Sequence, residues 1–400
     1  MSNTVFKAVI GKNFGDEGKG LATDFLCLNG AKNLVVRANG GAQSGHTVEV
    51  GTKRFVFHEL SSGSFRHADT YWAGTYHPDL YKLAEEVEDF RAVSGFVPGI
   101  FAAKDAGITT ILDVILNMIF ETNRGADRHG SCGMGIYETE LREQAGYKIT
   151  VGDVIKTGEA GLTNFLFDIR EGYTKKRLKE EKLTHDLITE YLGLLNDDNI
   201  VINYAKTVCN NVKLVKTVYS ERELFKRYDQ VIFENGQGLL LDSECERFRP
   251  NVTGSRTGLV NVAKILENTG FSLNEAVYVS RSYVTRHGAG KLPCEFEASE
   301  IPGLITDVTN IPNEWQGKLR FAPHESVSEF VEAVSEDLLN VSERPKVSLL
   351  LTHLNETDGH VIFDGFKMPP ATLKEDEQIK RVFGNVYLSY DRFAENIKKG

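Results

Sequence analysis

Apolar runs and amphipathic stretches alternate along most of this chain. The run 5–10 leads into a glycine-rich turn, and an amphipathic stretch over 21–28 follows that turn. Further apolar runs predict strands over 33–36, 109–112, 230–233, 276–279, 347–351 and 386–388. Strands that alternate with helical stretches are typical of folds with a largely parallel sheet. The pattern therefore predicts an α/β fold with a central, mostly parallel sheet flanked by helices.

Three segments depart from this alternation. Residues 46–50 and 54–58 predict a hairpin that turns around Gly51. Residues 160–213 carry mixed charges at helical spacing and predict a helical insertion. Residues 295–325 are weakly patterned, and either a mobile substrate loop or a plain surface loop is expected there. Because no repeat, low-complexity tract or linker divides the chain, we expect one large domain over residues 1–400.

Composition narrows the class of function. The chain has 400 residues, of which 41% are hydrophobic and 26% charged, as in ordinary soluble proteins. Its net charge of -10 argues against nonspecific binding to nucleic acid or to an anionic membrane. The N-terminus lacks the apolar core of a signal peptide, and no apolar run reaches transmembrane length. Five scattered cysteines without a CxxC pair favour reduced thiols, so a cytoplasmic protein is expected.

The turn after the first predicted strand carries the strongest chemical signal. It reads Gly15-Asp16-Glu17-Gly18-Lys19-Gly20. A strand, a glycine-rich turn and a helix start can hold phosphate on backbone N–H groups. Phosphate repels carboxylates, so Asp16 indicates a base or a Mg²⁺ ligand, and Lys19 indicates a charge placed on phosphate. The spacing of the glycines fits neither a Walker A loop nor a GxGxxG motif. The alternative without a functional role is a plain acidic turn with Glu17 at the start of a helix.

Other polar elements follow glycines or predicted strands. His46 comes after a Gly-Gly and a Ser-Gly, where the backbone can approach a ligand closely, although a lone histidine at a strand start is more often structural. Residues 234–238, Glu-Asn-Gly-Gln-Gly, end a buried strand, where ligand-facing residues of parallel sheets gather. Residues 285–290, Thr-Arg-His-Gly-Ala-Gly, follow Tyr283 in the same way. Each element alone is weak evidence for a ligand site, but the set of elements together is specific.

Taken in order, these elements resemble the adenylosuccinate synthetase family. The family's opening signature, an aromatic residue followed by Gly-Asp-Glu-Gly-Lys-Gly, is matched by residues 14–20. Its Asn-Gly-Gly-x-Asn-Ala-Gly-His-Thr-Val element is similar to residues 39–48. Its Glu-Gly-x-Gln-Gly element, which runs on through Leu-Asp to Val-Thr-Ser, resembles residues 234–238, 241–242 and 252–255. Residues 285–295 and 351–355 resemble its Thr-Arg-Val-Gly-x-Gly-Pro-x-Pro-Thr-Glu and Leu-Thr-Lys-Leu-Asp elements.

The resemblance implies a purine-biosynthesis ligase that joins L-aspartate to C6 of a 6-oxopurine nucleotide, with IMP favoured, through a 6-phosphoryl intermediate to give adenylosuccinate. It implies a nucleoside triphosphate, GTP or ATP, as co-substrate and Mg²⁺ as cofactor. Asp16 would take the purine N1 proton and bind Mg²⁺ together with the carbonyl of Gly45, His46 would act at the transferring phosphoryl, and Lys19 would hold donor phosphates. The residues that the resemblance further implies in nucleotide or phosphate binding are Gly15, Glu17, Gly18, Gly20, Gly45, Thr47, Ser131, Gln237, Thr253, Arg286, Thr352 and Asn355.

This chain also departs from the family pattern. The family's aspartate-binding loop is rich in arginine, whereas only Lys318 and Arg320 remain here after Thr309, and these three are expected to bind aspartate. The family borrows an arginine across a dimer interface, so Arg142 is expected to contact phosphate from the other subunit of a homodimer. The family's aspartate in Lys-Leu-Asp selects guanine, and an amide at Asn355 predicts that this selection loosens or shifts to adenine.

Two alternatives stay open. A phage-associated branch of the family acts on dGMP, and with ATP or dATP it would give a 2-aminoadenylosuccinate for 2-aminoadenine synthesis. Asn355 and His287 favour that branch, whereas the retained Asp16 favours IMP. The alternative from another class is a catalytically silent purine-nucleotide-binding protein, which the retained Asp16, Lys19 and His46 disfavour. An NAD-dependent dehydrogenase is disfavoured because no dinucleotide fingerprint follows any predicted strand.

Overall fold

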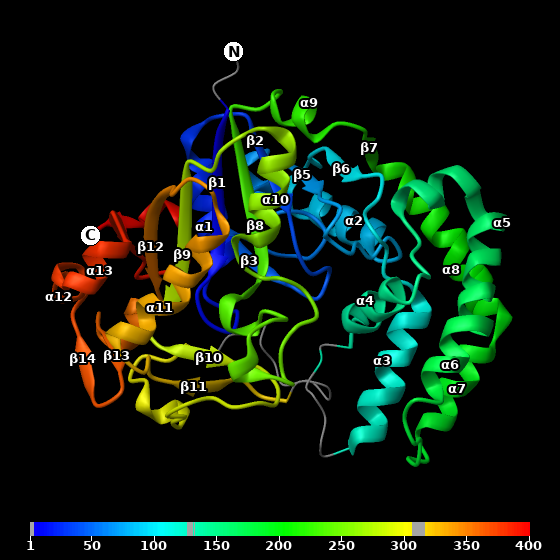
Figure 1. Ribbon diagram of the computed structural model, residues 1–400. Coiled ribbons are helices and arrows are strands. Elements are labelled where there is room, and N and C mark those ends of the chain that lie inside the picture. Colours follow the sequence, from blue (N-terminus) through cyan, green and yellow to red (C-terminus); the bar gives the residue numbers. More distant parts are fainter. Residues whose placement is uncertain (1–3, 126–130, 132, 306–316) are drawn as a thin grey trace.

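A ten-stranded sheet runs through the protein in the order β16-β15-β12-β9-β1-β8-β2-β5-β6-β7 (Figure 1). The computed structural model describes residues 4–125, 131, 133–305 and 317–400. All neighbouring strands are parallel except β15 and β16, which confirms the predicted mostly parallel α/β sheet. The strands are β1 Val5–Gly11, β2 Asn33–Arg37, β5 Asp69–Trp72, β6 Ile100–Ala103, β7 Lys216–Val218, β8 Gln230–Gly238, β9 Glu275–Arg281, β12 Lys346–Thr352, β15 Asn385–Leu388 and β16 Lys398–Lys399.

Both faces of the sheet are covered, as the apolar character of its strands requires. On β1, Ala8 and Ile10 belong to the large core under α10 (Leu259–Thr269) and α11 (Val327–Asp337). Val9 points to the opposite face, where it packs with Ala22 and Leu26 of α1 (Lys19–Leu26). The alternation along β1 therefore fixes α1, and with it the glycine-rich turn, against one face of the sheet.

A group of helices extends beyond the β7 edge of the sheet, at the right of Figure 1. It consists of α3 Ile111–Arg124, α4 Ile136–Gln144, α5 Val151–Ile169, α6 Lys175–Leu178, α7 Ile188–Asn196 and α8 Asp198–Asn211. This arrangement confirms the helical pattern of residues 160–213, and the insertion begins earlier than that pattern indicated. The other helices are α2 Leu83–Ser94, α9 Glu221–Phe225, α12 Pro370–Glu375 and α13 Glu377–Val382.

Within the described residues, three antiparallel strand pairs lie outside the main sheet. β3 His46–Val50 and β4 Lys53–Phe57 form the hairpin that the sequence predicts around Gly51. The other pairs are β10 Val284–Arg286 with β11 Arg320–Ala322, and β13 Val361–Phe363 with β14 Phe366–Met368. Part of the loop expected over 295–325 lies outside the described residues, at 306–316.

The strand expected over 109–112 is wrong. Thr110 is the N-cap of α3, where its hydroxyl accepts the backbone N–H of Asp113 and the Asp113 carboxylate accepts the backbone N–H of Thr110. This reciprocal capping box starts a helix, and the threonines and isoleucines that resemble a strand continue into it. The strand at this place in the chain is β6, which ends at Ala103.

None of the helices in the described part of the chain combines the length and the hydropathy needed to span a membrane. The cysteines within that part, Cys27, Cys209, Cys245 and Cys294, form no disulfide with one another, as expected from their spacing.

Candidate active site

Five neighbouring strands, β12, β9, β1, β8 and β2, end at the same edge of the sheet, and a cavity of about 1200 Å³ opens there. In parallel sheets ligand-binding residues gather beyond the carboxyl ends of the strands. Most of the residues that the sequence points to line this one cavity, although they come from distant parts of the chain. They are Gly15, Asp16, Gly18, Lys19, Gly20, Gly45, His46, Thr47, Ser131, Gln237, Thr253, Arg286, Thr352 and Asn355.

Glu17 organises the glycine-rich turn from within. Its carboxylate is buried, and one oxygen accepts the backbone N–H groups of Asn13 and Gly15 at 3.0 and 2.8 Å. The other oxygen lies 2.9 Å from Nζ of Lys19, which is also buried. The turn therefore carries its own counter-charge, and Glu17 fixes the direction of the Lys19 ammonium instead of facing a ligand.

The turn is also tied to β12 and β8. The Thr352 hydroxyl donates to the carbonyl oxygen of Glu17 at 2.7 Å. A side chain at Gly238 would place its Cβ 2.2 Å from the carbonyl oxygen of Asn13, so only glycine allows β8 to pass this close to the turn. The backbone of the turn is thus held from both neighbouring strands.

Asp16 presents its half-buried carboxylate to the cavity from a left-handed backbone, with φ of 60°. Its Oδ2 lies 2.9 Å from Nε2 of His287, and its carbonyl oxygen accepts Nε–H of Arg281 at 2.5 Å. Burial alone would raise the pKa of Asp16, but His287, Arg281 and Lys19 outweigh burial and hold that pKa below its usual value. Asp16 is therefore ionised at neutral pH, as a base or a metal ligand must be.

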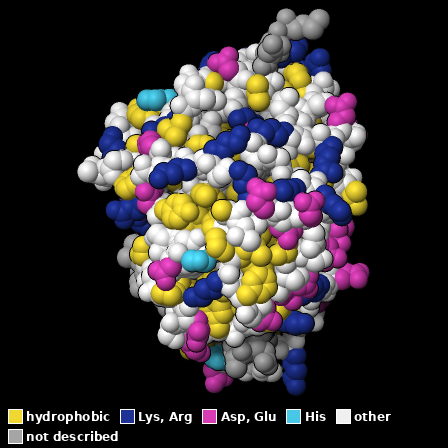
Figure 2. All heavy atoms as spheres, turned by 90° about the vertical axis from the view of Figure 1, so that its left-hand side faces the viewer, with side chains coloured by type: hydrophobic (Ala, Val, Ile, Leu, Met, Phe, Trp, Pro, Cys, Tyr) yellow, Lys and Arg dark blue, Asp and Glu magenta, His cyan; other side chains and the backbone are white. Residues whose placement is uncertain are grey.

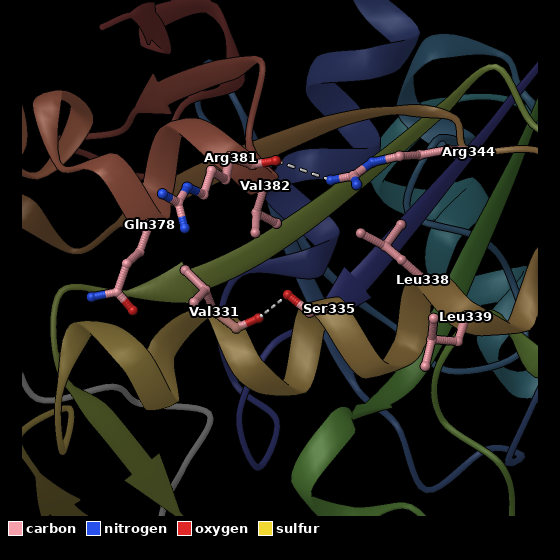
Figure 3. A pocket seen from close by; sticks show the side chains of 8 residues that line it. All are labelled: Val331, Ser335, Leu338, Leu339, Arg344, Gln378, Arg381 and Val382. Carbon is pink, nitrogen blue, oxygen red and sulfur yellow. Dashed lines mark hydrogen bonds between the residues drawn. The ribbon is translucent and has the colours of Figure 1, made fainter.

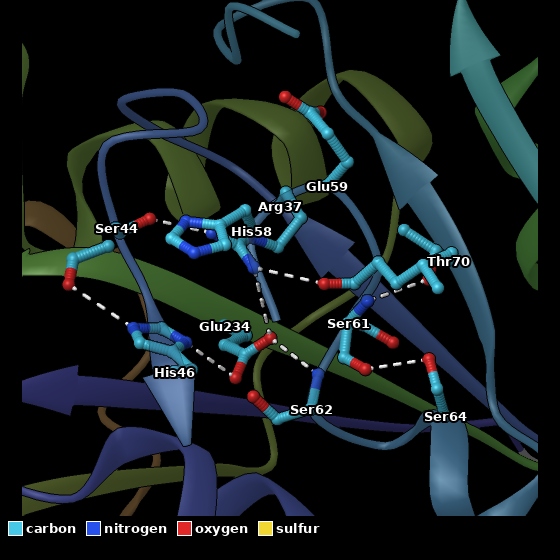
Figure 4. Close-up of polar contacts among 12 residues, drawn as sticks. Arg37, Ser44, His46, His58, Glu59, Ser61, Ser62, Ser64, Thr70 and Glu234 are labelled. Atoms are coloured by element: carbon cyan, nitrogen blue, oxygen red, sulfur yellow. Dashed lines mark hydrogen bonds and ion pairs between the residues drawn. The ribbon is translucent and has the colours of Figure 1, made fainter. Parts of the chain in front are cut away.

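His46 is backed by a buried charge network (Figure 4). Its Nδ1 lies 2.8 Å from Oε1 of Glu234, which lies on β8 opposite the last residue of β2, and its Nε2 lies 3.4 Å from the carbonyl oxygen of Gly236. Oε2 of Glu234 accepts the backbone N–H of Ser62 and lies 3.7 Å from Nη1 of Arg37. The Glu234 carboxylate therefore fixes the orientation of the imidazole.

The pKa values of this pair have opposing causes. Burial would raise the pKa of Glu234, but His46, Arg37 and the N–H of Ser62 outweigh it and lower that pKa to about 2. Burial lowers the pKa of His46, and the charge of Glu234 opposes this shift. An anionic group brought next to His46 would favour its protonated form, so the pair is suited to donate a proton to, or to stabilise, a transferring phosphoryl group.

Uncharged polar side chains also line the cavity, beside charged ones such as Glu121 and Arg124. The Asn117 amide and the Ser131 hydroxyl bond each other at 2.8 Å. Near His46, Gln237 accepts a hydrogen bond from Asn39 at 3.4 Å. These amides and the hydroxyl offer uncharged donors and acceptors, which suit the edges of a nucleotide base and its sugar.

Besides Glu17, other expected residues of the described part do not line the cavity. Arg142 is fully buried, and its guanidinium is bound by both carboxylate oxygens of Asp113 and by the carbonyl oxygens of Ile108 and Tyr147. Its donors are satisfied inside its own subunit, and the expected contact to a phosphate of a second subunit stays a prediction. Arg320 is bound by both oxygens of Glu295 and by two carbonyl oxygens.

Neither Arg320 nor the exposed Lys318 is among the described residues that line the cavity, which does not fit the expected aspartate contacts. Thr309 lies outside the described residues. Arg286 does line the cavity, but it stacks on Phe14, with its guanidinium carbon 4.5 Å from the ring centroid, and donates to the carbonyl oxygens of Lys291 and Asn251. It therefore also holds the cavity wall together.

Sequence reasoning missed Arg37 and Arg281, and it named Glu234 only as part of the element 234–238, without a role. Arg37 and Arg281 end β2 and β9, Glu234 lies opposite Arg37 on β8, and all three are buried. A charged residue that interrupts an apolar strand at its last positions was the available signal. Their partners could not be inferred, because those partners come from other strands.

The oxygen donors around Asp16 fit Mg²⁺. In the described ranges no three His, Cys, Asp or Glu side chains are grouped so that they could hold a metal ion by themselves. Mg²⁺ is usually bound through one or two carboxylates, with the remaining ligands coming from water and substrate phosphates. The Asp16 carboxylate and the Gly45 carbonyl, both at the cavity, match that donor set.

A second hollow lies between α11 and α13 (Figure 3). Figure 2 shows the side of the molecule that carries the C-terminal elements. Val331, Leu338 and Val382 form the apolar lining of this hollow, with Arg344 and Arg381 beside them. None of the residues that the sequence singles out lines it. The chemistry of the chain is therefore concentrated in the large cavity.

Known proteins of one family are similar to this chain. The family model described as adenylosuccinate synthetase matches residues 8–326. The adenylosuccinate synthetase of Lactobacillus acidophilus is 27% identical over 415 residues, covering 98% of this chain and 91% of that protein. The enzyme of Thermoplasma acidophilum is 28% identical over 300 residues, covering 72% of this chain and 63% of that protein.

Two solved structures share the fold. Fully ligated adenylosuccinate synthetase from Plasmodium falciparum superposes with a TM-score of 0.72 at 17% identity, covering 98% of this chain and 99% of that one. Succinoaminodeoxyadenylate synthetase of cyanophage S-2L, bound to dGMP and dATP, superposes with a TM-score of 0.63 at 14% identity, covering 99% and 95%. The family model spans most of the sequence, and this chain belongs to the adenylosuccinate synthetase family of C–N bond-forming, nucleotide-dependent ligases.

Proposed function

We propose that this enzyme joins L-aspartate to C6 of IMP through a 6-phosphoryl intermediate and releases adenylosuccinate. The observation that carries this proposal is the presence of Asp16 and the buried His46–Glu234 pair in one cavity, with Lys19 beside them. The oxo group of a purine is a poor leaving group, so it must be phosphorylated before an amine can displace it. A base, a phosphoryl-stabilising group and a phosphate-binding turn are the parts this reaction requires.

Asp16 takes the proton from N1 of the acceptor in the first step. Removing that proton places negative charge on O6, which then attacks the γ-phosphorus of the donor, and the nucleoside diphosphate leaves. The ionised state of Asp16 supports this role, because only the carboxylate accepts a proton.

His46 and Lys19 act on the phosphates. His46 bonds the oxygen atoms of the transferring phosphoryl group, and Glu234 favours the imidazolium that this contact requires. Lys19, held by Glu17, donates to the donor phosphates, as do the backbone N–H groups of the turn. In the second step the aspartate amine attacks C6, and phosphate leaves with the former O6.

Mg²⁺, held by the Asp16 carboxylate and the Gly45 carbonyl, would neutralise charge on the donor phosphates. For the donor itself we propose ATP or GTP, without the strict choice of guanine. The support is Asn355, which lines the cavity and carries an amide that both donates and accepts hydrogen bonds. A carboxylate at this position could only accept.

The second candidate is the same chemistry on dGMP with ATP or dATP. Asn355 and His287, both at the cavity, favour it, and retention of Asp16 favours IMP. We further propose that residues 1–400 act as one domain, as a homodimer and in the cytoplasm. These three proposals rest on the family resemblance.

A substrate grid tests the function. The purified chain is incubated with aspartate and Mg²⁺, each of IMP, dIMP, GMP and dGMP is combined with each of GTP, ATP and dATP, and products are identified by mass. We expect the succinyl adduct of IMP together with phosphate release, and Asp16→Asn abolishes both while the protein stays folded. An adduct only from dGMP would favour the second candidate. Thermal stabilisation by nucleotides without any product would favour a silent binding protein.

A further inference from the structure

The backbone of Asp16 has a conformation that aspartate adopts only at some cost. Its φ is 60°, and the neighbouring Gly15 has φ of 99°. The left-handed region is disfavoured for residues with a Cβ, and such outliers persist where the surrounding structure holds them. Asp16 is the residue that presents a carboxylate to the cavity from this backbone, so the contacts that hold it bear on the reaction.

Two side chains hold Asp16 at its two ends. Arg281, the last residue of β9, donates to the backbone carbonyl oxygen of Asp16 and also bonds the Tyr283 hydroxyl at 3.0 Å. His287, just beyond β10, bonds the Asp16 side chain with 2.9 Å between Nε2 and Oδ2. Arg281 and His287 both line the cavity. One short segment of the chain thus fixes the main chain and the carboxylate of Asp16.

We propose that His287 is a positioning residue that sets the orientation of the Asp16 carboxylate for proton transfer from the acceptor. This inference rests on the proposed function. With Oδ2 bound to an imidazole N–H, rotation of the carboxylate about its Cβ–Cγ bond is restricted, and the other oxygen keeps one direction. Proton transfer needs donor and acceptor within about 2.6–3.2 Å, and a misplacement of about 1 Å lowers rates about 100-fold.

Orientation explains the contact better than activation does. A cationic or N–H donor next to a carboxylate favours its charged form and so makes it a weaker base. The contact to His287 therefore cannot increase the intrinsic basicity of Asp16. Its benefit to the reaction is geometric, which distinguishes it from the His46–Glu234 pair, where the carboxylate favours the charge that the imidazole must carry.

Two substitutions separate positioning from a role in stability alone. His287→Leu removes the N–H donor, whereas His287→Gln keeps an amide N–H at a comparable distance from the backbone. His185→Leu, between α6 and α7 and outside the cavity, is the matched control. Each variant is assayed by steady-state kinetics with the acceptor and donor that the unaltered enzyme uses, and its thermal midpoint is measured.

We expect His287→Leu to lower kcat about 100-fold while KM for the triphosphate and for aspartate changes less than about threefold. His287→Gln should recover kcat to within about tenfold of the unaltered enzyme, at a thermal midpoint similar to that of His287→Leu. Equal kcat in the Leu and Gln variants, or losses of activity that follow the thermal midpoint, would overturn the inference. Lack of turnover by the unaltered enzyme with every substrate pair would instead refute the proposed function, and this inference with it.

Discussion

Nδ1 of His46 lies 2.8 Å from Oε1 of Glu234, and both side chains are buried at the edge of the sheet where the central strands end. The hairpin β3–β4 supplies the histidine, and β8 supplies the carboxylate. An imidazole backed by a carboxylate is oriented, and its protonated form is favoured when an anion approaches. This arrangement suits a group that must meet a phosphoryl during transfer.

Glu234→Gln should lower kcat on the order of 100-fold, because the neutral amide no longer favours a protonated His46. Glu234→Ala should in addition lower the free energy of unfolding by about 3–5 kcal/mol, since it leaves the fully buried Arg37 without its nearest carboxylate. Steady-state kinetics and urea denaturation measure the two effects. Glu223→Gln, an exposed position on α9, should change neither, and a Glu234→Gln enzyme with unaltered kcat would exclude the pair from the reaction.

Asn355→Asp should restore a preference for GTP. A carboxylate accepts hydrogen bonds from guanine N1 and its 2-amino group, whereas it repels the acceptor N1 of adenine. Such charge-assisted bonds contribute about 1.5–3 kcal/mol, so the ratio of kcat/KM for GTP over ATP should rise about 10- to 100-fold. Strict dependence on GTP in the unaltered enzyme would contradict the role given to Asn355.

The raised pKa of Glu140, a residue of α4, predicts that the free energy of unfolding depends on pH. Burial raises its pKa to about 7, the nearby Glu143 adds to this shift, and His77, with Nε2 at 3.9 Å, opposes it. The unfolded chain releases this proton near pH 4.3, so between about pH 5 and 7 the folded state holds a proton that the unfolded state has lost, and stability falls as pH rises.

Glu140→Gln removes that dependence. The stability of the variant relative to the unaltered enzyme should therefore increase by on the order of 2 kcal/mol from pH 5 to pH 7.5, as measured by urea unfolding at both values. A difference that does not depend on pH would show that Glu140 titrates near its ordinary value in the folded protein.

Gly238→Ala should disturb the phosphate-binding turn. The added Cβ would lie 2.2 Å from the carbonyl oxygen of Asn13 and 2.7 Å from Oε1 of Glu17, so β8 and the turn must separate. We expect the free energy of unfolding to fall by about 1–3 kcal/mol and the KM for the triphosphate to rise. Gly193→Ala, on α7 where nothing lies within 4 Å of the added Cβ, is the control.

The sequence predicts most of the sheet and the position of the turn because both depend on local patterns. The runs at 230–233 and 276–279 are apolar except for Gln230, as is typical of strands buried on both faces, and they fall within β8 and β9. The run at 109–112 is also rich in β-branched residues, but Thr110 and Asp113 form a capping box there, and this box starts a helix. Composition alone does not distinguish these two outcomes.

Local sequence patterns could not predict which charged residues contact each other. His46 and Glu234 are 188 positions apart, and Asp16 meets His287 and Arg281 only because β1 and β9 are neighbours in the sheet. Arg142 shows the same limit. The family resemblance assigns it to a dimer interface, and no local pattern indicates that Asp113 and two carbonyl oxygens of its own subunit bind it. Which charges meet is decided by strand order and helix packing.

The transfer of oxygen from the purine to phosphate tests the central claim most directly. IMP labelled with ¹⁸O at position 6 is converted with aspartate, Mg²⁺ and the preferred triphosphate, and the released inorganic phosphate is analysed by mass spectrometry. Because the 6-phosphoryl intermediate forms through O6, the account predicts one ¹⁸O atom in each phosphate released. Unlabelled phosphate, with the label left in water or in the nucleotide, would contradict it.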